Sequence, residues 1–193
     1  MEDPNAEALY EYSRRGKVDE VRALLDGGVG PDAYLAYDGS TPLIIAARGG
    51  RAEVVSLLLE RRASLEPRTD DGSSVLIHAV SGGSQEAVRV LLGARADANE
   101  GNDDGVTPLI LAADKGVLDV VRALVEAGAD VGVAAEDWGS PLDSAAAAGH
   151  SEVEAYLASL GATAGAQAQP REARKVAASE QWGYDAFDGE EDY

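Results

Sequence analysis

A unit of 33 residues repeats along most of this chain, and this repeat restricts the fold more than any other feature of the sequence. The same point of successive units is marked by four matching segments: Thr41-Pro42-Leu43-Ile44, Ser74-Val75-Leu76-Ile77, Thr107-Pro108-Leu109-Ile110 and Ser140-Pro141-Leu142-Asp143. A half-matching unit, with Gly16 and Leu24-Leu25 in the same phase, comes before them. Periods of 20–50 residues indicate that similar structural units stack side by side.

Each unit predicts two short antiparallel helices and a turn. Thr41-Pro42 is an N-cap followed by proline at the first helical position. Gly50 permits a left-handed turn into the second helix. Apolar residues from Val54 to Leu58 then follow helical spacing and form one buried stripe. Asp38-Gly39 is a turn signal at the tip of a hairpin-like finger.

These units resemble the ankyrin-repeat family over residues 5–162. The resemblance implies an all-α solenoid of stacked helix–turn–helix hairpins with β-turn fingers, in which polar terminal units cap the stack. The family usually has His after Thr-Pro-Leu, whereas this chain has Ile or Asp. We therefore expect the stack to rely more on apolar packing. The predicted ankyrin-repeat domain, 1–162, is divided into a cap at 5–33, repeats at 34–66, 67–99 and 100–132, and a second cap at 133–162.

The repeat pattern stops after Gly161. Residues 163–180 are predicted to be a linker with a short helix, and 181–193 an acidic-aromatic tail that contains Trp182, Tyr184 and Phe187. Three interpretations of this tail stay open. It is a short motif for a partner, an extra cap on its own repeats, or an acidic end without a partner.

Charge and composition narrow the functional classes. The formal net charge of -19 disfavours nucleic acid and anionic membranes as partners and favours a protein with a basic surface. The same acidity would also keep a monomer soluble. The sequence has no cysteine, which excludes disulfides and thiolate chemistry. The paired carboxylates are expected in solvated loops without a neighbouring histidine, since His78 is expected in the core and His150 in a turn. We therefore expect no enzyme activity, cofactor or metal site.

The resemblance implies that a partner docks on the finger tips and first helices. The doubled carboxylates of the fingers exceed what one turn needs, although Asp before Gly is also ordinary turn chemistry. Arg48, Ser81, Asp114, Lys115 and Ala147 are expected at the exposed ends of the first helices. The predicted partner-binding residues within the repeats are Tyr37, Asp38, Arg68, Asp70, Asp71, Asp103, Asp104, Glu136, Asp137 and Trp138.

The sequence therefore predicts an adaptor or escort that binds a basic protein through its finger tips and its tail. The alternatives are a structural subunit of a large ciliary or cytoskeletal assembly and a regulatory subunit that docks on an enzyme. We expect a cytoplasmic location, with nuclear and ciliary locations open, because residues 1–4 are acidic and polar and no apolar run is long enough to span a bilayer.

Overall fold

The computed structural model describes residues 4–165, and these residues form a stack of helical pairs. The helices within this range are α1 (Pro4–Arg15), α2 (Val18–Asp26), α3 (Pro42–Arg48), α4 (Ala52–Glu60), α5 (Val75–Ser81), α6 (Gln85–Gly93), α7 (Pro108–Lys115), α8 (Leu118–Glu126), α9 (Pro141–Ala148) and α10 (Ser151–Ser159). The predicted all-α repeat architecture is confirmed.

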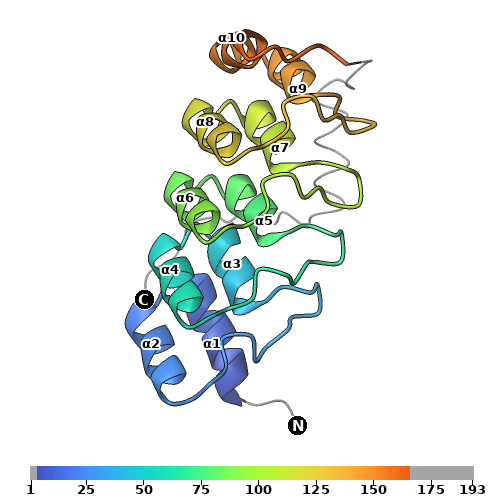
Figure 1. The fold of residues 1–193 in the computed structure, drawn as a ribbon. Coiled ribbons are helices and arrows are strands. Elements are labelled where there is room, and N and C mark those ends of the chain that lie inside the picture. The colour runs from blue at the N-terminus through green and yellow to red at the C-terminus, as the bar shows by residue number, and fades with distance from the viewer. Residues whose placement is uncertain (1–3, 166–193) are drawn as a thin grey trace.

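The helices lie in two rows (Figure 1). The odd-numbered helices α1 to α9 form the inner row, and the even-numbered helices α2 to α10 form the outer row. Each helix packs against its partner in the same pair and against its counterpart in the next pair. The loops that connect successive pairs project together from one side of the stack. These loops are the predicted fingers.

Local signals in the sequence determine where the inner helices begin and end. The hydroxyls of Thr41, Ser74, Thr107 and Ser140 each accept a hydrogen bond from the backbone N–H three residues later, as expected for N-caps. A glycine in the turn from each inner helix to its outer partner adopts the predicted left-handed conformation, for example with φ of 67° at Gly50 and 72° at Gly116. A Cβ atom at Gly116 would also overlap the ring of His150.

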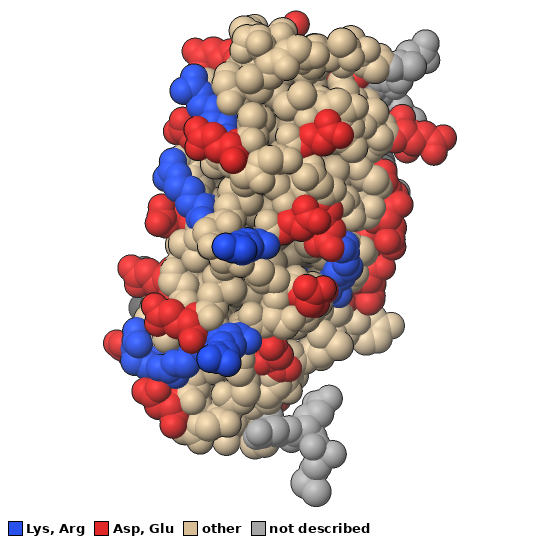
Figure 2. All heavy atoms as spheres, in the orientation of Figure 1, with Lys and Arg blue, Asp and Glu red and all other residues tan. Residues whose placement is uncertain are grey.

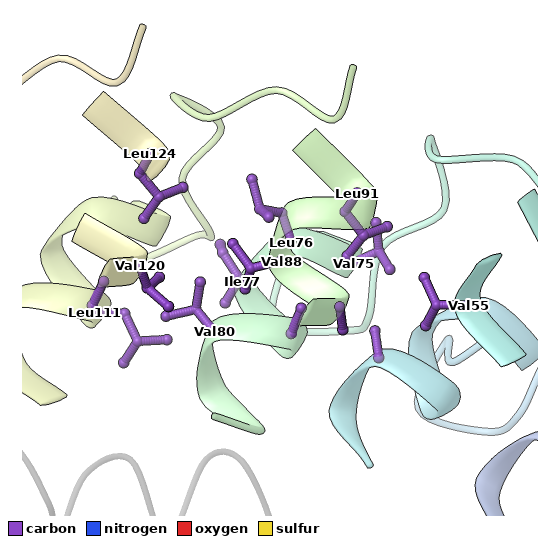
Figure 3. Packing of buried hydrophobic residues seen from close by; sticks show 14 of the residues in the cluster. Val55, Val75, Leu76, Ile77, Val80, Val88, Leu91, Leu111, Val120 and Leu124 are labelled. Carbon is purple, nitrogen blue, oxygen red and sulfur yellow. The ribbon is translucent and has the colours of Figure 1, made fainter. Parts of the chain in front are cut away.

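The core runs along the full length of the stack. Leu43, Leu76 and Leu109 occupy the same position in successive inner helices, and all three are fully buried. Residues from neighbouring units interdigitate around them, as Figure 3 shows for α5, α6 and their neighbours. Because each apolar stripe is covered by the next unit, no pair of helices buries its core alone.

Polar contacts also join the units, so the expectation of mainly apolar packing is incomplete. The Arg61 guanidinium is 2.8 Å from the Asp26 carboxylate of the previous unit. The Arg51 guanidinium donates to the Arg14 carbonyl. His150, the turn histidine, places Nε2 2.9 Å from the Asp114 carbonyl. The position after Thr-Pro-Leu has no histidine to form hydrogen bonds between units, but residues at other positions form them.

Candidate protein-binding surface

Four fingers form the candidate surface, and we number them in chain order: finger one is 34–40, finger two 67–73, finger three 100–106 and finger four 133–139. Backbone hydrogen bonds tie the first three together. The N–H of Asp70 donates to the Asp38 carbonyl at 3.0 Å, and the N–H of Asp103 donates to the Asp71 carbonyl at 3.1 Å. These bonds hold the tips of fingers one to three in one continuous row.

Two of the predicted carboxylates serve the turns themselves. Asp38 accepts hydrogen bonds from the backbone and hydroxyl of Ser40, and both terminal nitrogens of Arg48 lie 3.2 Å from it. Partial burial raises the pKa of Asp38, but the hydrogen bonds from Ser40 and the charge of Arg48 outweigh it and hold that pKa below its usual value. Asp38 is therefore already neutralised by a residue of its own chain.

Asp71 is held in the same way in finger two. The hydroxyls of Thr69 and Ser73 donate to its carboxylate at 2.5 and 2.7 Å. Burial raises the pKa of Asp71, but these hydrogen bonds lower it by more. The carboxylate therefore stays ionised, with a pKa below its ordinary value. Asp71 faces into the turn and is a poor contact for a partner.

His78 links these two turns. Arg48 Nε lies 3.4 Å from His78 Nδ1, and Thr69 Oγ1 lies 2.9 Å from His78 Nε2. Because Arg48 Nε can only donate, His78 Nδ1 accepts, and the ring proton lies on Nε2 facing Thr69. Burial lowers the pKa of His78 to about 4, and the nearby charge of Arg48 adds to this effect. The predicted core histidine thus carries a polar chain from Asp38 to Asp71.

The other five predicted carboxylates are exposed at the finger tips. In the view of Figure 2, the edge where Figure 1 shows the fingers is mainly acidic, while the opposite edge carries basic and acidic side chains side by side. A buried Asn102 makes the turn of finger three by accepting from the Val106 N–H, which frees both acids of that finger from this task. The exposed carboxylates are Asp70, Asp103, Asp104, Glu136 and Asp137.

Arg68 and Trp138 have structural partners. Arg68 forms an ion pair with Glu100 and donates to the Gly72 carbonyl. Trp138 is half-buried and packs against the core. Ser81 and Asp114 are also buried, so the expectation that they are exposed at the helix ends is wrong. The structural roles of Thr69 and Asn102 were not predicted from the sequence. The only signal for them is that each is a hydrogen-bonding residue two positions before a finger aspartate.

Finger one differs from the others because its tip is apolar. Tyr37 is 103% exposed, and it occupies the position that is Asp70, Asp103 or Glu136 in the other fingers. Leu35 beside it is 65% exposed. The base of finger one is held in place because the ring of Tyr34 packs on Tyr10 of α1 at 5.0 Å between centroids. The tip therefore presents apolar surface without a packing role.

The last described residues return to the finger side of the stack. Asp143 is the N3 residue of a capping box with Ser140, and its Oδ2 also accepts from the N–H of Gly165 at 2.8 Å. The chain beyond Gly165 thus starts beside finger four. Most of the linker and the predicted contacts Trp182, Tyr184 and Phe187 lie outside the described residues.

Within residues 4–165, no group of three or more His, Cys, Asp or Glu residues is arranged to hold a metal ion. No helix in this part of the chain is long and apolar enough to cross a membrane.

A family model for ankyrin repeats, described as three copies, matches residues 2–69 and 76–168. No curated protein sequence matches the chain significantly. The chain belongs to the ankyrin-repeat family. It is accordingly a protein–protein interaction module, as the stacked fold and the finger row indicate.

Proposed function

We propose that the protein is an adaptor or escort for a protein with a basic surface, which it binds along the exposed tips of fingers two to four. The observation that carries this proposal is the division of the finger carboxylates. Asp38 and Asp71 are held by their own turns, whereas Asp70, Asp103 and Asp104 extend into solvent.

Electrostatics supports this function over a purely solubilising role. Like charges on neighbouring fingers repel one another, and a basic partner would relieve that repulsion. Two basic residues of the finger side, Arg48 and Arg68, are engaged with Asp38 and Glu100 of the same chain. The acidic-aromatic tail would then add a second contact and increase avidity.

A charge-matched pair of variants tests this proposal. The finger variant carries Asp70→Asn, Asp103→Asn and Asp104→Asn, and the control carries Asp19→Asn, Asp119→Asn and Glu126→Gln on the outer helices. Both lose three exposed carboxylates. The measurement is the anisotropy of a fluorescent arginine-rich peptide titrated with the full chain at increasing salt.

We expect the finger variant to bind about tenfold more weakly than the wild type, because each exposed charge pair contributes about 0.2–1 kcal/mol. The control should bind within about twofold of the wild type, and high salt should remove the difference. Equal weakening of peptide binding in both variants would mean that net charge alone, and not the finger tips, determines the affinity. Binding that is independent of salt would favour the assembly-subunit or enzyme-regulator alternatives.

A further inference from the structure

The apolar tip of finger one has no occupant among the described residues. Of these residues, three large hydrophobic side chains are exposed, and two of them, Leu35 and Tyr37, stand together on this tip. The equivalent positions of the other fingers carry Arg68, Gly101 or Ala134, and Asp70, Asp103 or Glu136. Because the two side chains stand together, they form an apolar surface that another segment can cover.

The chain's own C-terminal segment starts at the opposite end of the same row. The hydrogen bond from Gly165 to Asp143 holds the chain at the first turn of α9, directly after finger four. Fingers four and one are three units apart, which is about 30 Å at the usual 8–10 Å between packed helices. Residues 166–181 span up to about 50 Å when extended. The aromatic residues from Trp182 onward can therefore reach finger one.

The basic residues of that segment come before its aromatic residues, although Glu172 and Glu180 lie among them and five more carboxylates follow Trp182. Arg171 is six residues and Lys175 ten residues beyond Gly165, so they reach at most about 20 and 33 Å from it. This range covers fingers three and two, where Asp70, Asp103 and Asp104 are exposed. A chain that follows the row would place basic residues over acidic tips and aromatic residues over the apolar tip.

We propose that, in the absence of a partner, residues 166–193 lie along the finger row, with Trp182, Tyr184 and Phe187 on Leu35 and Tyr37 and with Arg171, Arg174 and Lys175 over fingers two and three. The tail is thus an intramolecular occupant of the binding surface. This consequence rests on the proposed function: a basic partner must displace the tail before it binds the fingers. The apparent affinity for that partner is then the intrinsic affinity multiplied by the fraction of molecules in which the row is uncovered.

A spin label on the full chain tests this placement without any partner. The sequence has no cysteine, so Gly189→Cys provides a single attachment point two residues beyond Phe187. Paramagnetic broadening of backbone amide signals then reports which part of the stack the tail approaches. We expect the amides of 35–39 to lose most of their intensity and those of finger four to keep most of it.

Two pairs of variants identify the cause of the broadening. Leu35→Ser with Tyr37→Ser should abolish the broadening at finger one. Leu160→Ser, which alters the third exposed large hydrophobic residue of the described range 4–165, at 43%, should leave it unchanged. Changing Arg171, Arg174 and Lys175 to Gln should weaken it. Changing the exposed Arg15, Arg22 and Arg89 to Gln is the charge-matched control.

Three results would overturn the proposal. Broadening confined to α10 would make the tail a cap on the last unit, and uniform weak broadening would mean that it has no site on the stack. Broadening of isotope-labelled, spin-free chains mixed with spin-labelled, isotope-free chains would show that a second copy supplies the tail. None of these results bears on whether a basic protein binds the fingers, which the peptide titration measures separately.

Discussion

Replacing His78 with leucine should remove a specific part of the protein's sensitivity to acid. His78 is 9% exposed and occupies the position of Ile45 and Leu111 in the neighbouring units, so leucine fits the site. Its pKa falls to about 4 in the folded protein, because of burial and the charge of Arg48. In the unfolded chain it has the ordinary value near 6.5.

The sign of the effect follows from where the proton binds. Above about pH 6.5 the imidazole is neutral in both states, and its contribution to stability is fully present. Between pH 6.5 and 4 the unfolded chain binds a proton that the folded protein does not, so the free energy of unfolding falls as the pH falls. At pH 5 the loss is about 2 kcal/mol, from 1.36 kcal/mol per pKa unit, and it levels off near 3 kcal/mol below pH 4.

Urea unfolding of wild type and His78→Leu over this pH range measures the effect. At about pH 7.5 the two free energies of unfolding should agree within about 1 kcal/mol. In the variant, Arg48 still donates hydrogen bonds to Asp38 and Ser40, and Thr69 still donates to Asp71. At pH 5 the variant should be more stable by about 2 kcal/mol, or about 4–8 °C in Tm for a chain of this size. Carboxylates common to both proteins largely cancel in the difference.

Parallel pH profiles would refute this reasoning, because they would mean that His78 titrates alike in the folded and unfolded states. A variant that is several kcal/mol less stable at pH 7.5 would refute the second part of the argument. It would show that the polar chain through His78 stabilises the stack far beyond what leucine packing can replace.

Three further predictions concern the stack. Gly116→Ala should destabilise the stack by more than about 1 kcal/mol in thermal melts, because the left-handed φ and the overlap with the His150 ring both oppose a Cβ atom. Gly83 has a left-handed φ too, but a Cβ atom there meets no neighbour, so Gly83→Ala should destabilise the stack less. Asp143→Ala should lower stability by about 1 kcal/mol through loss of the capping box, and hydrogen exchange at Gly165 should accelerate. Leu109→Ala, at a fully buried position, should lower the free energy of urea unfolding by about 2–5 kcal/mol.

The architecture was predictable because its signals are local and recur in every unit. An N-cap acts on the backbone three residues away, and a glycine acts on its own φ, so Thr107 and Gly116 indicate helix ends without reference to the rest of the fold. The period then repeats this information in each unit. Stacking follows because no single stripe can be buried within its own unit.

The candidate surface was predictable in position but not in composition. The sequence places seven carboxylates on the fingers, and only Asp38 and Asp71 come two residues before a serine, but this spacing does not show that the serine bonds back to the carboxylate. What separates them is whether a hydroxyl and an N–H two residues later turn toward the carboxylate, and whether Arg48 reaches it across the loop. Those contacts depend on side-chain directions in three dimensions.

The repeat by itself determined the helices, their caps, the fingers and the buried stripes, because each depends on residues within one unit. Only the tertiary structure decided how the units are joined by polar groups. Arg48 and His78 stand 30 residues apart and meet because successive inner helices pack side by side. Asp143 and Gly165 meet because the chain turns back after α10. Such contacts depend on the distance between elements in space, which no pattern within a single unit specifies.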